Sequence, residues 1–370
     1  MDVDNISVEA AAPDATLAAE IIDRFRSDLI RYVPQIEAHE STVEDDERHP
    51  HCLRVKLRLE AAFDVEDWGE FVGHRVSKVV LDAVNASGAA IDHAFFDDEP
   101  IQLVALADST SGIFPHTPEP TAENLSGEGG LCDAVPGLKA DVGFAQDPDG
   151  DRLAIVDETG RYIGEEYTLA LCAVSILEAR KAAGESFDDV VLCANLSTSR
   201  MIDDIAATYG ASVVRTAVGE ANVVEAMKRL KREGKTVLLG GEGNGGVIWP
   251  EVTYVRDSLG SMALVLSLMA RAGKTVSELV ADFPRYAIVK RKQPSAKKED
   301  AKPAIERIAA HYASERVDTQ DGVRVDFDSK KAWVHVRASN TEPILRLIAE
   351  AEDEATANEI LDEVAKLVER

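Results

Sequence analysis

The chain has 370 residues, 45% of them hydrophobic, which predicts two or three globular domains. Its 67 acidic residues against 40 basic ones give a formal net charge of −27, which disfavours nucleic acid and anionic membranes as partners. The longest apolar run, residues 262–270, is too short to cross a bilayer and the N-terminus has no basic leader, so we expect a cytoplasmic protein without a membrane partner.

The region before residue 76 has the weakest pattern. Helical periodicity begins near Asp14 and covers residues 14–33, whereas residues 39–52 are densely charged and predict an exposed loop. Residues 53–63 fit a strand and a helix equally well. We treat residues 1–75 as a separate N-terminal region whose fold the pattern leaves open.

Clearer signals begin at Lys78. Residues 78–89, 101–108 and 140–146 are short runs rich in β-branched or small residues, separated by loops, and predict strands. Residues 164–180 then predict a helix. Its apolar face is expected at Leu169, Cys172, Ala173 and Ile176.

A second alternation fills residues 188–246. Apolar runs at 188–196, 211–218 and 235–246 are separated by helical patterns at 199–210 and 221–234. Strands that alternate with helices predict a parallel sheet with right-handed crossovers. Ligands of such sheets bind at the carboxyl ends of the strands.

The C-terminal part has a different organisation. Residues 290–303 form a basic, proline-bearing segment that we interpret as a solvated linker at a domain boundary. Beyond it we expect a helix at 304–313, a hairpin at 322–339 that turns at residues 328–330, a strand at 343–352 and a closing helix at 355–370. The fold class is therefore α/β, with mixed α/β domains and a C-terminal α+β domain, and we place the boundaries at 1–75, 76–165, 166–288 and 289–370.

The sequence "DPDGDR" has the spacing of a cation site. Asp147, Asp149 and Asp151 can turn toward one hard cation, and Arg152 lies beside them. A calcium-binding EF-hand loop also has Glu at its twelfth position, as Glu158 is here, but its sixth position is glycine and a helix follows it. Here the sixth position is Arg152 and a strand pattern follows, so we expect a turn between two strands that binds Mg²⁺. The alternative is an acidic surface turn.

The glycine-rich segment "GGEGNGG" directly follows a predicted strand. Glu242 and Asn244 alternate between the glycines, and we expect both to point outward and to hold vicinal sugar hydroxyls. The segment lacks the Lys-Ser/Thr ending of a P-loop, which disfavours a nucleotide phosphate. A plain flexible turn is the alternative.

A third polar turn, "VRASNTEP", combines an arginine, two hydroxyls and an amide. Pro343 prevents the turn from continuing as a helix, and a guanidinium with hydroxyls nearby favours an anion site. The expected phosphate-binding residues are Arg337, Ser339, Asn340 and Thr341.

In this order the three segments resemble the α-D-phosphohexomutases, the superfamily of phosphoglucomutase, phosphomannomutase and phosphoglucosamine mutase. Residues 111–125 and 215–223 are similar to the stretches that precede its metal and sugar loops, so the resemblance covers about residues 75–370. It implies interconversion of hexose or hexosamine 1-phosphate and 6-phosphate through a phosphoserine, with Mg²⁺ as the cofactor. It further implies that Arg152 lies next to the transferring phosphoryl group.

The sequence departs from the family pattern in two places. None of Ser7, Ser27 and Ser41 lies in a T-A-S-H-N-P-like loop, so the phosphoserine is not identified and the first domain is expected to be shortened or divergent. Gly246 stands where many members carry a histidine. The alternatives are therefore a Mg²⁺- and sugar-phosphate-binding homologue without catalysis, or a subunit whose serine comes from another chain. The pattern indicates neither the hexose nor the oligomeric state.

Overall fold

The computed structural model describes residues 75–96, 101–294, 301–339 and 344–368, together with three N-terminal strands. These strands, β1 (Val8–Ala12), β2 (Ile36–Asp45) and β3 (Leu53–Ala61), pair in the antiparallel order β1-β3-β2. The undecided segment that begins at residue 53 is thus a strand. The expectation of a loop at 39–52 is wrong for residues 39–45, which belong to β2. The helix expected at 14–33 lies outside the described residues.

The first large sheet has the strand order β5-β4-β6-β7. Strand β4 is parallel to both β5 and β6, whereas β7 pairs antiparallel with β6 and closes a hairpin. The strands are β4 (Lys78–Asp82), β5 (Gln102–Leu106), β6 (Val142–Gln146) and β7 (Leu153–Val156). The helices of this part are η2 (Gly88–Ala90), α3 (Asp92–Phe96), α4 (Ala122–Leu125) and α5 (Leu131–Leu138). All three predicted strands are confirmed.

The second sheet has the order β11-β10-β8-β9, with β8 parallel to both β9 and β10. Its strands are β8 (Val190–Asn195), β9 (Ser212–Thr216), β10 (Thr236–Glu242) and β11 (Gly246–Ile248). Its helices are α6 (Glu165–Ala182), α7 (Met201–Thr208), α8 (Glu220–Arg232), α9 (Ser258–Ala272) and α10 (Val276–Ala281). The predicted alternation is confirmed, and Glu242 ends a parallel strand at its carboxyl end.

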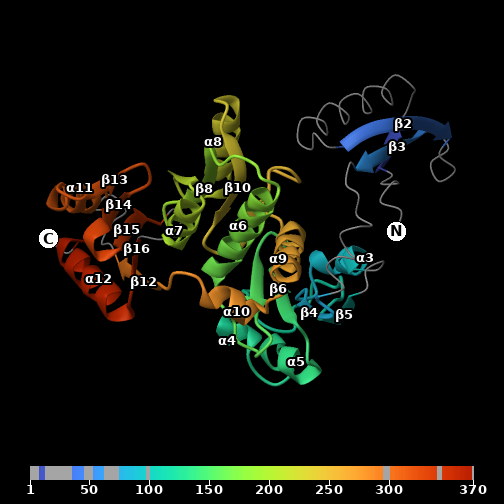
Figure 1. The fold of residues 1–370 in the computed structure, drawn as a ribbon, viewed down its shortest axis with the longest axis horizontal. Coiled ribbons are helices and arrows are strands. Elements are labelled where there is room, and N and C mark those ends of the chain that lie inside the picture. Colours follow the sequence, from blue (N-terminus) through green and yellow to red (C-terminus); the bar gives the residue numbers. More distant parts are fainter. Residues whose placement is uncertain are drawn as a thin grey trace.

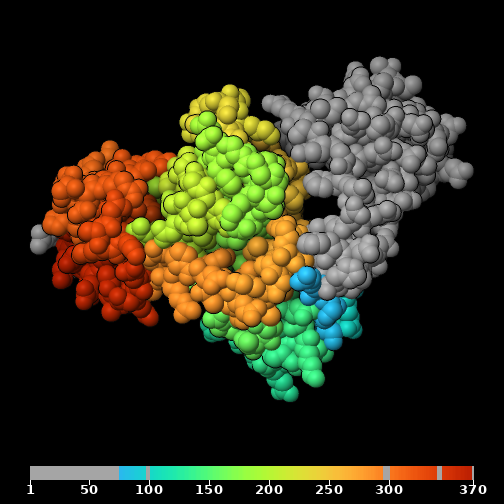
Figure 2. Space-filling view, in the orientation of Figure 1, coloured from blue at the N-terminus to red at the C-terminus, as the bar shows by residue number. Residues whose placement is uncertain are grey.

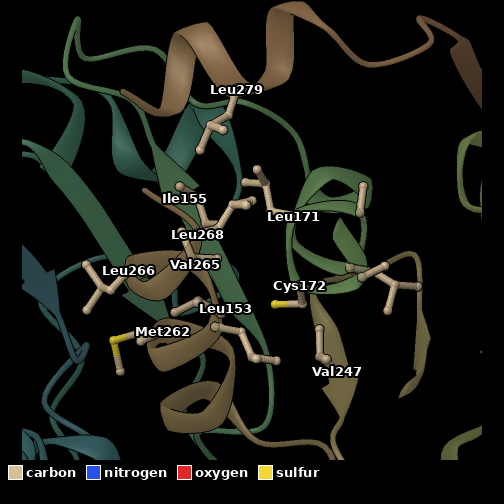
Figure 3. Packing of buried hydrophobic residues seen from close by; sticks show 14 of the residues in the cluster. Leu153, Ile155, Leu171, Cys172, Val247, Met262, Val265, Leu266, Leu268 and Leu279 are labelled. Atoms are coloured by element: carbon tan, nitrogen blue, oxygen red, sulfur yellow. The ribbon is translucent and has the colours of Figure 1, made fainter. Parts of the chain in front are cut away.

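Helices α6 and α9 pack between these two sheets and share one core with both of them (Figure 3). Leu153 and Ile155 of β7 meet Val265 of α9 there, while Leu171 of α6 is fully buried. Leu169, Cys172 and Ala173 of the apolar face expected for α6 are buried, and Ile176 is half-buried. The expected face is incomplete, because other positions are buried as well: Thr168, Ala170, Leu171, Ser175 and Leu177. Each large aliphatic side chain in such a core contributes about 1.5–3 kcal/mol. This shared core fixes the position of one sheet's loops relative to the other's.

The C-terminal unit is an antiparallel sheet of order β12-β16-β15-β14-β13 covered by two helices (Figure 1). In the space-filling view the same unit, coloured orange to red, lies at the left of the molecule (Figure 2). Its elements are β12 (Ala287–Pro294), α11 (Ala301–His311), β13 (Arg316–Asp318), β14 (Val323–Phe327), η4 (Asp328–Lys330), β15 (Ala332–Ala338), β16 (Ile344–Ala351) and α12 (Glu354–Val368). The predicted hairpin, strand and closing helix are confirmed. The interpretation of 290–303 as a linker is wrong for residues 290–294, which form part of β12, and for residues 301–303, which begin α11. Residues 295–300 lie outside the described residues.

The two faces of this sheet differ in chemistry. Alternate side chains such as Val325, Val334 and Leu347 pack against α11 and α12. The intervening positions put polar side chains on the opposite face, and several of these are buried: Arg324, Asp326, Trp333, His335 and Glu350. A buried polar face needs hydrogen-bonding partners. Some of them lie within the sheet, as Asp326 does for Arg324, and others come from the loop after β8 of the second sheet. No helix in the described part of the chain is long and apolar enough to span a membrane.

Candidate functional site

The aspartate turn lies between β6 and β7 and is organised by its first member. The carboxylate of Asp147 is buried, and its Oδ1 accepts the backbone N–H groups of Asp151 at 3.1 Å and Arg152 at 3.0 Å. Its Oδ2 accepts Nε–H of Arg152 at 2.6 Å. Such bonds from an aspartate to backbone groups that follow it stabilise a tight turn. Asp147 therefore shapes the turn as well as offering a ligand atom.

Two serines from other elements hold the same turn from outside. Ser87 donates its hydroxyl to the carbonyl of Pro148 at 2.8 Å, and Ser258, at the start of α9, donates to the carbonyl of Gly150 at 2.6 Å. Arg152 also donates to Glu119 at 2.8 Å, in the segment that the sequence analysis placed ahead of the metal loop. The turn is thus fixed at its outer edge by three parts of the chain.

The three aspartates fit a small hard cation. One carboxylate oxygen from each lies within 4.8 Å of the others, and a Mg²⁺ ion with ligands at about 2.0–2.1 Å places opposite oxygens about 4.2 Å apart. Oδ1 of Asp151 is buried and accepts no hydrogen bond from the described residues, with Nε of Arg152 3.7 Å away. Asp149 is exposed, which leaves it free to turn toward an ion. The donor set can therefore hold a metal.

The sugar-loop residues occupy different positions from those expected. Glu242 is buried and does not point outward to solvent, because its Oε1 accepts Nδ2–H of Asn195 at 2.6 Å and the backbone N–H of Gly219 at 3.0 Å. Asn244 is half-buried, and its Oδ1 accepts the backbone N–H of Gly246 at 3.2 Å. The carboxylate of Glu242 thus has a fixed orientation, while the amide of Asn244 shapes the loop.

The metal and sugar loops are in direct contact although they come from different sheets. The backbone N–H of Leu153 donates to the carbonyl of Gly245 at 3.0 Å. Gly245 has φ of +88°, and a Cβ atom there would lie 2.6 Å from the carbonyl oxygen of Leu153. Only glycine combines this backbone conformation with such a close approach.

Arg256 joins the two loops through its side chain, and no sequence pattern singled it out. Its Nη1 donates to Oε2 of Glu242 at 2.8 Å, its Nη2 to Oδ2 of Asp151, and its Nε to Glu220 at 3.1 Å. The stem of Arg256 crosses Gly246, where a Cβ atom would lie 2.3 Å from its Cδ. Gly246, which departs from the family pattern, therefore leaves the space that the side chain of Arg256 occupies.

The loop after β8, residues 195–200, forms hydrogen bonds with the sugar loop. Asn195 holds Glu242, and Oδ1 of Asn195 in turn accepts the backbone N–H of Ser197 at 2.8 Å. The hydroxyl of Thr198 accepts the backbone N–H of Gly243 at 3.0 Å. The sequence analysis missed this loop, although it lies where a parallel strand ends, which is the usual position of ligand contacts.

The same 195–200 loop contacts the polar face of the C-terminal sheet. Arg324 donates to the carbonyl of Leu196, and the backbone N–H of Arg200 donates to Glu350 at 2.9 Å. His335 is buried, with Nδ1 2.9 Å from the hydroxyl of Ser197 and Nε2 2.7 Å from the carbonyl of Asp321. Burial lowers the pKa of His335 to about 4, so its ring is neutral, donates from Nε2 and accepts at Nδ1.

The predicted phosphate loop continues from this contact. Arg337 follows His335 on β15, is half-buried, and its Nη1 lies 3.6 Å from a carboxylate oxygen of Asp321. Ser339 is buried, and its backbone N–H donates to the carbonyl of Ile344 at 2.9 Å. Asn340 and Thr341 lie outside the described residues. Asp321 also accepts the backbone N–H of Val218 at 3.0 Å, and the next residue, Gly219, donates to Glu242. Arg337 is therefore connected to the sugar loop through Asp321.

Glu166 lies beneath the sugar loop. A Cβ atom at Gly243 would lie 2.1 Å from its carboxylate, and its Oε2 accepts the backbone N–H of Ser199 at 2.9 Å. Burial raises the pKa of Glu166 to about 8, and the charge of Glu350 acts in the same direction. Near neutral pH this side chain is therefore mostly a neutral carboxylic acid.

The metal loop and the sugar loop thus meet at the carboxyl ends of parallel strands, the position at which α/β proteins bind small charged ligands, and the antiparallel C-terminal sheet contacts the 195–200 loop beside them. Three family models match the chain in order: phosphoglucomutase/phosphomannomutase alpha/beta/alpha domain II at residues 65–160, domain III at 165–286 and the C-terminal domain at 289–367. The chain belongs to the phosphoglucomutase/phosphomannomutase family, within the α-D-phosphohexomutase superfamily.

Relatives with assigned names agree with this membership. A phosphoglucomutase/phosphomannomutase of Thermococcus kodakarensis is 37% identical over 86% of this chain and 65% of its own length. A probable phosphoglucosamine mutase of Methanopyrus kandleri is 35% identical over 79% of this chain and 62% of its own length. The chain therefore spans slightly less than two thirds of the length of these relatives.

Solved structures show the same fold. A family protein from Burkholderia thailandensis superposes with a TM-score of 0.65 at 22% identity, over 89% of this chain and 75% of its own. N-acetylphosphoglucosamine mutase of Aspergillus fumigatus, in complex with GlcNAc-6P and magnesium, gives a TM-score of 0.58 at 16% identity, over 82% of this chain and 64% of its own. At these identities the likeness concerns the fold.

Proposed function

We propose that this protein interconverts a hexose or hexosamine 1-phosphate and the corresponding 6-phosphate with Mg²⁺ as its cofactor. The observation that carries the proposal is the contact of Arg256 with both Asp151 and Glu242, because it makes one site of two loops that are 91 residues apart. Family membership supplies the reaction class. A cytoplasmic location belongs to the same proposal, since charged sugar phosphates do not cross apolar barriers freely.

The unit at 76–165 supplies the metal-binding part of the site. Asp147, Asp149 and Asp151 would hold Mg²⁺, which when bound balances the charge on a phosphoryl group during its transfer. Arg152 stands at the edge of this triad, where its guanidinium can face phosphoryl oxygens. The paired carboxylates of Asp147 and Glu119 fix the orientation of that guanidinium.

The units at 166–288 and 289–370 supply the sugar and phosphate contacts. Glu242 is held rigidly by two donors on Oε1 and one on Oε2, and the remaining lone pair of Oε2 can accept from a sugar hydroxyl, with Asn244 beside it. Arg337 and Ser339, with Asn340 and Thr341, would hold the phosphate that does not react. The 195–200 loop sets the spacing between these two sets of contacts. A loose phosphoryl-transfer transition state depends mainly on such positioning.

Phosphorus NMR of the purified chain tests the proposal. The chain receives Mg²⁺, a trace of hexose 1,6-bisphosphate and, in turn, glucosamine 1-phosphate, glucose 1-phosphate and mannose 1-phosphate. A growing 6-phosphate resonance establishes the mutase and identifies its sugar. A sugar phosphate that binds without conversion identifies a non-catalytic binder instead, the second candidate that the unidentified phosphoserine favours. Addition of a separate serine-bearing first domain distinguishes a two-chain enzyme.

A further inference from the structure

The guanidinium of Arg256 is surrounded by three carboxylates that belong to three different segments. Asp151 comes from the metal loop, Glu242 from the sugar loop and Glu220 from the start of α8. The side chain is half-buried, so these ion pairs are only partly screened by water. The planar fork of arginine can serve three acceptors at fixed angles, which a lysine ammonium on a flexible stem cannot do.

Asp151 shows what this arrangement achieves. Its Oδ2 accepts from Arg256, whereas its Oδ1 is buried and accepts no hydrogen bond from the described residues. Leaving a buried carboxylate oxygen without a donor is unfavourable unless a cation or another partner completes it. Because the carboxylate is rigid and planar, holding Oδ2 also sets the direction in which Oδ1 points. That direction is toward Asp147, because Oδ1 of Asp151 lies 3.7 Å from Nε of Arg152, the same group that Oδ2 of Asp147 accepts at 2.6 Å.

The same guanidinium orients the sugar-loop carboxylate. Its Nη1 donates to Oε2 of Glu242, while Oε1 is held by Asn195 and Gly219. Gly246 keeps this geometry possible, because any side chain there would occupy the place of the arginine stem. The orientations of a metal-loop aspartate and a sugar-loop glutamate therefore depend on one side chain.

We propose that Arg256 is a positioning residue. It directs Oδ1 of Asp151 at the metal and the carboxylate of Glu242 at the sugar. One positively charged side chain thereby aligns the metal loop with the sugar loop. The inference rests on the proposed metal and sugar roles of these loops. It assigns to Arg256 a role in binding a cation, although the residue is itself positively charged.

This contradiction in charge makes the role testable with Mg²⁺ alone. If Arg256 were only a nearby positive charge, Arg256→Gln would remove repulsion and tighten Mg²⁺ binding. If it orients a ligand, as partners behind metal ligands do, the same variant weakens Mg²⁺ binding by about 10-fold or more. Isothermal calorimetry gives the dissociation constant, and Arg271→Gln is the matched control. Arg271 lies on α9 and donates to Ser175 in the core, so its loss should leave Mg²⁺ affinity unchanged.

Two further measurements complete the test. Arg256→Lys keeps the charge and most of the stem, and should show the same loss of Mg²⁺ affinity, which covers the case in which the glutamine variant does not fold. Binding of glucosamine 6-phosphate without Mg²⁺ should also weaken, because Glu242 loses its donor. Unchanged or tighter Mg²⁺ binding in both variants overturns the inference. If the unaltered chain does not bind Mg²⁺, the proposed function fails instead.

Discussion

Glu166, the half-buried acid beneath the sugar loop, makes the stability of this protein depend on pH. Glu166 keeps its proton in the folded chain up to a pKa of about 8, because burial and the nearby Glu350 oppose ionisation. In the unfolded chain the same side chain ionises near its ordinary value of 4.5. Between these two values the folded state holds one more proton than the unfolded state, so the free energy of unfolding falls as the pH rises.

The size of the effect follows from the two pKa values. They differ by about 3.5, and each pKa unit corresponds to about 1.36 kcal/mol, so the largest possible contribution is about 5 kcal/mol. Over the narrower window from pH 5 to pH 8 the loss is about 3 to 4 kcal/mol. Below about pH 4.5 both states are protonated, and above about pH 8 both are ionised, so this contribution is flat outside the window.

Urea unfolding followed by circular dichroism at pH 5, 6.5 and 8 measures this loss. Glu166→Gln keeps the shape of a neutral carboxylic acid but cannot ionise, so its free energy of unfolding should fall less than that of the unaltered chain across the window. Glu165→Gln is the control, because Glu165 is the preceding residue and pairs with Lys290 near the surface. If Glu166→Gln follows the same pH dependence as the unaltered chain, Glu166 is already ionised in the folded state and the reasoning is wrong.

Three other predictions concern the candidate site. Asp149→Asn is expected to weaken Mg²⁺ binding without lowering the melting temperature, because the side chain is exposed, and an unchanged affinity by calorimetry would place the metal elsewhere. Arg337→Ala is expected to weaken sugar-phosphate binding by about 1.5 to 3 kcal/mol, and an equal loss for the dephosphorylated sugar would contradict its phosphate role. Gly245→Ala is expected to cost about 1 to 3 kcal/mol more unfolding free energy than Gly210→Ala. Both glycines have positive φ, but only at Gly245 would the new Cβ meet a backbone oxygen, that of Leu153, so equal losses by urea unfolding would refute the close approach.

Much of the fold follows from local pattern because its central parallel strands β6 and β8 are buried on both faces. Residues 190–195 are buried at every position, which produces the continuous apolar run that identified the strand. The hairpin turn at 328–330 was equally clear, since charged residues interrupt two alternating segments there. Local chemistry and tertiary structure agree in these elements.

The errors occur where polar residues have a tertiary role. Because of Lys290 and Lys292, the sequence pattern predicted a linker at residues 290–294. These residues belong to β12, an edge strand of the C-terminal sheet. Charged side chains and a terminal proline on an edge strand prevent it from pairing with other chains. A basic run in an acidic chain is thus compatible with a protective edge as well as with a linker, and composition does not separate them.

The connecting residues of the site were missed for a different reason. Asp147, Glu242 and Arg337 lie in or next to loops whose composition is unusual, so a single sequence identifies them as candidates. Arg256 lies directly before the helix cap formed by Asp257, and a positive residue there has no distinctive local pattern. The contacts of Arg256 exist only because α9 packs between the two sheets. This packing brings Arg256 within reach of Asp151, 105 positions earlier in the chain, and of Glu242, 14 positions earlier. Residues that bind a ligand can be recognised from loop chemistry, whereas residues that align two loops become visible only when the packing of the domains is known.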